Sequence, residues 1–66
     1  MILRINGADA EVPDGTDAES LISLLGYRPE RVALEIDGRI CPRASRPTTV
    51  LEEGQKIEIV SFVGGG

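Results

Sequence analysis

Histidine is absent from this sequence, and cysteine occurs once, as Cys41. The chain therefore lacks the commonest general base of enzymes. Without histidine or a second cysteine, we expect no transition-metal site. A lone cysteine also excludes an internal disulfide, which favours a cytoplasmic protein that folds without covalent cross-links.

Long apolar runs and basic residues are also scarce. No run approaches the ~20 apolar residues that cross a membrane, and "MILRINGADAEV" lacks the pattern of a signal peptide. Seven basic and 11 acidic residues give a net charge of −4. Because an acidic surface repels phosphate backbones, we expect no nucleic-acid binding and instead a protein partner with a basic patch.

The chain has 66 residues, enough for one domain. A domain of this size buries only about 60% of its unfolded surface. A core and a deep catalytic cleft would not both fit, so we expect a protein that is not an enzyme.

The first third of the sequence predicts a hairpin and a helix. "MILRIN" and "ADAEV" alternate with period two around Asn6-Gly7, a strong hairpin turn signal. In "TDAESLISLLG", Thr16 and Glu19 have the spacing of a capping box, and Gly26 provides a stop. The apolar stripe of this helix is Ala18, Leu21, Ile22 and Leu25.

The remainder predicts further extended segments. "VALEID" and "RIC" flank the turn Asp37-Gly38, and "KIEIVSFV" is the last strand. Between them, "PRASRPTTVLEEG" has little periodicity, although its "TTVL" is compatible with a short extended piece. We interpret Cys41 as a small buried hydrophobe. The arginines of this region, Arg39, Arg43 and Arg46, are interpreted as solvated surface, and contact with an acidic surface of a partner is the alternative.

This order of elements predicts a two-layer α+β domain, with one helix on one face of a four- to five-stranded sheet. The predicted core is Leu3, Ile5, Leu21, Ile22, Leu25, Val32, Leu34, Ile36, Ile57 and Ile59.

The same order, ending in a hydrophobic strand and three glycines, resembles the ubiquitin-like β-grasp fold. Within that fold the chain is most similar to the ThiS-like sulfur carriers of thiamine biosynthesis. The resemblance covers the whole chain and rests on "MILRING", "LISLLG", "VALEIDGRICPR" and "LEEGQKIEIVSFVGGG". It implies a mixed sheet, a β-grasp domain at residues 1–63 and a flexible tail at residues 64–66.

The resemblance also implies a chemistry at Gly66. A ThiF-like adenylyltransferase, using ATP and magnesium, would adenylate the terminal carboxylate, and the chain itself would bind no cofactor. A cysteine-derived persulfide would then supply sulfur to form a thiocarboxylate. A ThiG-like thiazole synthase would use that sulfur for the thiazole ring of thiamine.

The predicted site is the tail, Gly64, Gly65 and Gly66, together with the strand end that precedes it. Glycines have no Cβ, so they fit a narrow channel and adopt whatever φ and ψ a partner demands. Val60, Phe62 and Val63 are predicted to bind partners beside the tail. A bulge near the strand end would instead turn Val60 and Phe62 into the core.

Other interpretations stay open from the sequence. The small subunit of molybdopterin synthase and carriers for other sulfur metabolites have similar ends. A ubiquitin-type modifier shares the adenylation step, and a plain ubiquitin-like interaction module would have an idle, frayed tail.

Overall fold

The computed structural model describes residues 1–62. In chain order its elements are β1 (Ile2–Ile5), β2 (Ala8–Glu11), α1 (Ala18–Leu24), the 3-10 helix η1 (Pro29–Arg31), β3 (Val32–Ile36), β4 (Arg39–Ile40), the 3-10 helix η2 (Arg43–Thr48) and β5 (Lys56–Ser61).

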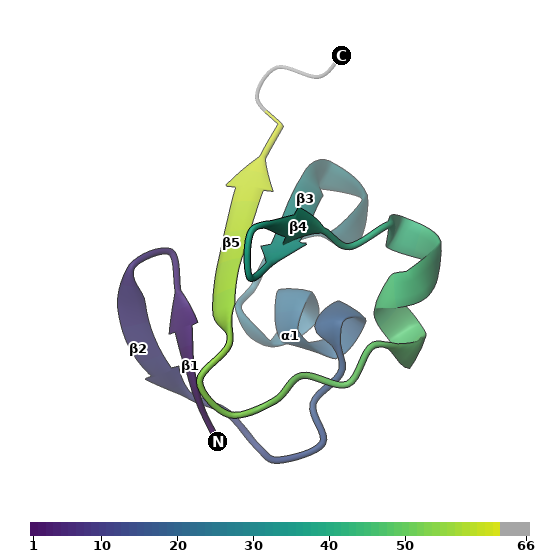
Figure 1. The fold of residues 1–66 in the computed structure, drawn as a ribbon. Helices are drawn as coiled ribbons and strands as arrows, with labels where there is room; N and C mark the ends of the chain where they lie inside the picture. The colour runs from purple at the N-terminus through teal and green to yellow at the C-terminus, as the bar shows by residue number, and fades with distance from the viewer. Residues whose placement is uncertain (63–66) are drawn as a thin grey trace.

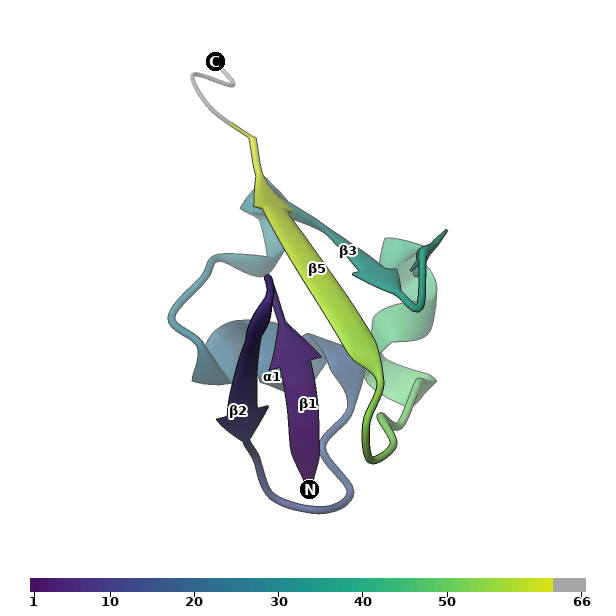
Figure 2. The ribbon, with the colours of Figure 1, turned by 60° about the vertical axis from the view of Figure 1, so that its left-hand side comes forward.

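The strands form one five-stranded sheet in the order β2-β1-β5-β3-β4. β5 pairs in parallel with β1 and antiparallel with β3, so the sheet is mixed. Figure 2 shows β5 between β1 and β3, with α1 behind the sheet. The predicted two-layer α+β architecture is therefore confirmed.

Both predicted hairpin turns are present. Asn6 and Gly7 have φ values of 49° and 85°, and Asp37 and Gly38 have 51° and 84°. Positive φ at both central residues is the requirement of a type I′ turn, which asparagine, aspartate and glycine meet at little cost. These two turns are properties of the local sequence.

The core lies between α1 and the sheet. Most of the predicted members are buried, although Ile5 and Ile36 are only partly so. Cys41 is buried, as interpreted from the sequence, and Val12 and Leu51 join the core. The fully enclosed large side chains are Leu3, Leu21, Ile22, Leu34 and Ile57.

The predicted N-cap of the helix, Thr16, is wrong by one residue. Asp17 is the cap, and its carboxylate accepts hydrogen bonds from the Ser20 amide at 2.9 Å and the Ser20 hydroxyl at 2.6 Å. The Thr16 hydroxyl instead donates to the carbonyl of Pro13 at 2.6 Å. A β-bridge to Val50 holds Asp17 in an extended conformation, so the helix begins only after it.

The predicted helix end is confirmed, but the burial of Leu25 is not. Gly26 has a φ of +87°, its amide donates to the Ser23 carbonyl, and the Tyr27 amide donates to the Ile22 carbonyl. These two bonds form a Schellman motif. Leu25 is the C-cap residue, where the chain leaves the helix, and it is 37% exposed. It lies at the edge of the core and is not a buried member of it.

Residues 43–50 are more ordered than the sequence suggests. η2 occupies most of this segment, and Val50 supplies the short extended piece as an isolated bridge. Arg39 and Arg43 are exposed, as predicted.

The surface assignment of Arg46 is wrong. Arg46 is 3% exposed, and its guanidinium donates hydrogen bonds to the carbonyls of Pro29 at 2.9 Å and Val32 at 2.7 Å. The Glu19 carboxylate lies 3.8 Å from the same guanidinium. Arg46 therefore ties η2 to the junction of η1 and β3, a contact that the sequence alone does not predict.

Candidate functional site

The candidate site is built on the C-terminal half of β5, which leads toward the predicted reactive residues. Ile57 and Ile59 point into the core, with 0% and 6% exposure. Leu34 of β3 lies opposite Ile59, and Ile36 lies opposite Ile57. β5 is an interior strand: β1 pairs with its first two residues, Lys56 and Ile57, and β3 pairs with it from Ile57 to Ser61 (Figure 1).

Two turn residues brace β5 from opposite sides. The Asn6 side chain accepts a hydrogen bond from the Ile59 amide at 2.8 Å and donates to the Ile59 carbonyl at 3.3 Å. The Asp37 carboxylate accepts from the Lys56 amide at 2.9 Å. From the sequence, both residues are predicted only to form turns; their second role depends on where the sheet places β5.

A backbone hydrogen bond anchors the chain beyond the last residue of β5. The Phe62 amide donates to the Arg31 carbonyl of η1 at 2.8 Å. Residues 63–66 lie outside the described residues, so the predicted roles of Val63, Gly64, Gly65 and Gly66 stay predictions. The described part of the site is thus β5 and Phe62, which precede these residues in the chain.

The predicted exposure of Val60 and Phe62 is confirmed, at 54% and 56%. Both lie on the sheet face opposite α1, because they alternate with the buried Ile57 and Ile59. No bulge reverses this phase, since β5 pairs in continuous register with β3 up to Ser61.

Further residues extend this surface across the sheet. Ala33 lies opposite Val60, and Ile40 of β4, which is 70% exposed, lies opposite Glu35 on the same face. We call Ala33, Ile40, Val60 and Phe62 the apolar patch; Glu35 and Glu58 lie opposite each other on the same face, between Ile40 and β1. Ile40 was not singled out in the sequence, because a two-residue edge strand has too short a pattern to assign its faces. Exposed apolar surface of this kind is typical of protein interaction sites.

Other chemistry is sparse among residues 1–62. They contain no group of three or more histidine, cysteine, aspartate or glutamate residues placed to hold a metal ion. The Cys41 thiol is buried and lies 3.8 Å from the Thr49 hydroxyl. Over the same described range, no helix has the length and apolar character needed to cross a membrane.

Comparison with known proteins gives a match over nearly the whole chain. Residues 3–66 match the model of the ThiS family. The crystal structure of a thiamine biosynthesis protein (ThiS) from Geobacter metallireducens superimposes with a TM-score of 0.85 and 29% identity, over 100% of both chains. This similarity confirms the predicted β-grasp fold.

Relatives of similar sequence include two much longer proteins and one of about the same length. A thiazole synthase from Magnetococcus marinus is 38% identical over all 66 residues, and one from Paramagnetospirillum magneticum is 36% identical. This chain spans about a fifth of the length of each of them. The uncharacterized protein ycf40 of Porphyra purpurea is 30% identical over 64 residues, covering 97% of this chain and 90% of that protein.

Proposed function

The chain belongs to the ThiS family, and from this premise we propose that it is a sulfur carrier of thiamine biosynthesis. Gly66 is the proposed carrier residue, and its carboxylate is the group that receives sulfur. The chain is then a protein cosubstrate, and the catalytic groups belong to its partners. The observation that supports this proposal most directly is the placement of β5, an interior strand after which the Phe62 amide is still hydrogen-bonded, so that in the sequence only Val63 separates the anchored residue from the glycines.

The first proposed step is activation of the carboxylate. An ionised carboxylate is a poor electrophile, so an oxygen of Gly66 attacks the α-phosphorus of ATP in a ThiF-like adenylyltransferase. Pyrophosphate leaves, and a mixed anhydride with AMP forms. ATP and magnesium belong to that partner. We propose that the reaction takes place in the cytoplasm, where ATP is available.

The second proposed step introduces sulfur. The terminal sulfur of a cysteine-derived persulfide attacks the activated carbonyl, and AMP leaves. A thiol then attacks the resulting acyl disulfide, which releases the thiocarboxylate and forms a new disulfide. Cys41 has no part in these steps, because its thiol is buried in the core.

A ThiG-like thiazole synthase is the proposed acceptor of this sulfur. The two relatives named thiazole synthase support this choice, since each contains a segment similar to this chain within a protein about five times as long. Joining a donor and an acceptor in one chain raises their effective concentration. The apolar patch and Val63 are the proposed contact surface for this acceptor.

The glycines suit delivery of the carboxylate into a partner. Three extended residues reach roughly 10 Å, and residues without Cβ pass through a narrow channel. Ordering them on binding costs conformational entropy, which contacts of the apolar patch offset.

Intact mass spectrometry tests this proposal. After incubation with a ThiF-like adenylyltransferase, ATP, magnesium and a persulfide donor with a thiol, the mass should rise by one sulfur less one oxygen. A variant lacking Gly65 and Gly66 should fold and show no mass change. The adenylyltransferase is first shown to be active on the carrier from its own organism. If the mass of this protein then stayed unchanged, sulfur carriage would be refuted.

A further inference from the structure

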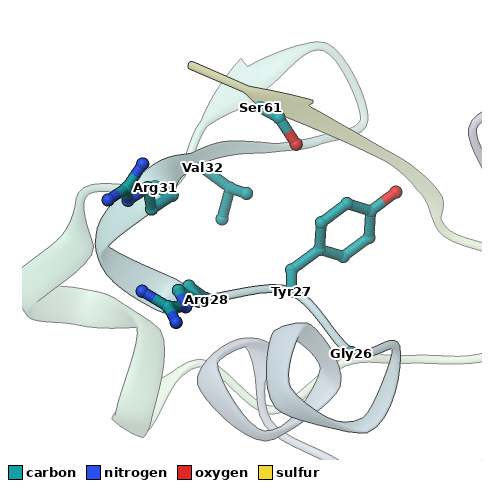
Figure 3. Close-up of a pocket in the computed structure, with 6 residues that line it drawn as sticks. All are labelled: Gly26, Tyr27, Arg28, Arg31, Val32 and Ser61. Atoms are coloured by element: carbon teal, nitrogen blue, oxygen red, sulfur yellow. The ribbon is translucent and has the colours of Figure 1, made fainter. Parts of the chain in front are cut away.

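A pocket of about 340 Å³ lies beside the end of β5, on the opposite side from the apolar patch. Its lining residues come from the turn after α1, from η1, from the start of β3 and from β5: Gly26, Tyr27, Arg28, Arg31, Val32 and Ser61. Figure 3 shows the Tyr27 ring between the end of α1 and Ser61, with the arginine side chains on the other side of Val32. The pocket and the root of the tail are neighbours, because Ser61 lines the pocket and Phe62 bonds to Arg31.

The pocket has an apolar floor and a basic rim. Val32 is 4% exposed, and Tyr27 is partly buried against the core. Arg28 and Arg31 are exposed at the rim. Two exposed arginines thus line one pocket in a chain whose net charge is −4, although the exposed Glu30 lies between them in η1. Guanidinium groups prefer carboxylates, with which they form charge-assisted and often bidentate hydrogen bonds.

The walls of the pocket are held in place before any partner binds. The Schellman motif at Gly26 determines the path of the turn that carries Tyr27. The buried Arg46 holds both ends of η1 through the carbonyls of Pro29 and Val32. A preformed pocket lowers the ordering cost of binding.

We infer that this pocket receives an acidic segment of the adenylating partner. One apolar side chain of that segment lies on Tyr27 and Val32, and neighbouring carboxylates bind Arg28 and Arg31. A partner that encloses the tail must also lie against the surface around the tail's root, and the charges of this rim select an acidic segment there. The inference rests on the proposed function, since it assigns a surface to the first partner of that reaction.

Charge reversal tests the inference in a matched design. The pair Arg28→Glu and Arg31→Glu alters the pocket, and the pair Arg39→Glu and Arg43→Glu alters exposed arginines of β4 and η2 that do not line it. Both pairs change the net charge equally. Affinity for a ThiF-like adenylyltransferase is measured by calorimetry without ATP, and turnover by pyrophosphate release. Far-UV circular dichroism and thermal midpoints check that all proteins fold.

The pocket pair should weaken binding about tenfold or more, and the control pair less than about threefold. Turnover at saturating carrier should stay near the wild-type value. Added salt should weaken binding of the wild type to the adenylyltransferase more than binding of the pocket pair. Equal effects of the two pairs would overturn the inference and leave the proposed function standing. Wild-type binding without pyrophosphate release would refute the proposed function, while the affinities would still decide the role of the pocket.

Discussion

Among the charged residues of this protein, we expect replacement of Arg46 to lower the free energy of unfolding the most. Sequence alone predicts a solvated arginine, whereas the structure gives it 3% exposure and two hydrogen bonds to main-chain carbonyls. Arg46→Ala would leave the carbonyls of Pro29 and Val32 without these donors, and would leave Glu19 without its nearby cation. An unsatisfied buried carbonyl loses its hydrogen bonds to water without replacement.

The size of the loss follows from these contacts. Each hydrogen bond from a charged donor contributes about 1.5–3 kcal/mol. Breaking a fully buried charged pair costs about 3–5 kcal/mol, which is an upper limit here because the Glu19 side chain is 33% exposed. We therefore expect Arg46→Ala to lower the free energy of unfolding by ~3–5 kcal/mol. A domain of 66 residues has about 3–10 kcal/mol in total, so this variant lies close to the limit of folding.

Two milder variants keep the experiment informative. Arg46→Lys retains the charge but cannot donate to both carbonyls in the geometry of a guanidinium, so it should lose less than Arg46→Ala. Arg46→Met retains the bulk of the side chain but no donor. If the lost hydrogen bonds cause the destabilisation, it should recover little of the stability lost in Arg46→Ala. Arg43→Ala is the control, because Arg43 is an exposed arginine of the same 3-10 helix. It should change stability by no more than ~0.5 kcal/mol.

Urea unfolding followed by far-UV circular dichroism measures these differences. Hydrogen exchange of the Phe62 amide adds a local readout, because its acceptor is the Arg31 carbonyl of the 3-10 helix that Arg46 holds. Protection at this amide should fall in Arg46→Lys even where the global stability suffices. A loss below ~1 kcal/mol in Arg46→Ala, or full recovery in Arg46→Met, would refute the hydrogen-bonding account.

Four other perturbations have defined outcomes. Leu21 is fully buried and Leu24 is 59% exposed in the same helix, so Leu21→Ala should cost ~2–5 kcal/mol and Leu24→Ala less than ~1 in chemical denaturation. Hydrogen bonds from Ser20 hold the pKa of Asp17 below its ordinary value. Its charge therefore stabilises the fold above the ordinary carboxyl pKa, and this contribution is lost as the pH falls through the lowered pKa of the folded state. The stability difference between wild type and Asp17→Asn should shrink in that acid range, and a constant difference would contradict this. Cys41→Ala should retain sulfur carriage by intact mass, since the thiol is buried. Phe62→Ser should weaken binding to a ThiG-like thiazole synthase with an unchanged thermal midpoint, because the side chain is 56% exposed; undiminished affinity would exclude it from that interface.

Much of the fold was determined by short-range patterns. The two type I′ turns depend on Asn6-Gly7 and Asp37-Gly38, and the helix end depends on Gly26, because positive φ is a local requirement. The exposure of Val60 and Phe62 followed from period-two alternation once one face of the strand was assigned to the helix. The family resemblance rested on the same local segments.

Tertiary structure alone decided three other features. The helix begins after Asp17 because a bridge to Val50, far along the chain, holds that residue extended. Arg46 is buried because η1 and β3 present carbonyls to it, and no pattern around residue 46 encodes that arrangement. The pocket joins Tyr27 to Ser61, residues that meet only when β5 lies beside β3. Sequence periodicity reports which face of an element is apolar, whereas the partners of a polar group depend on which distant segments the chain brings together.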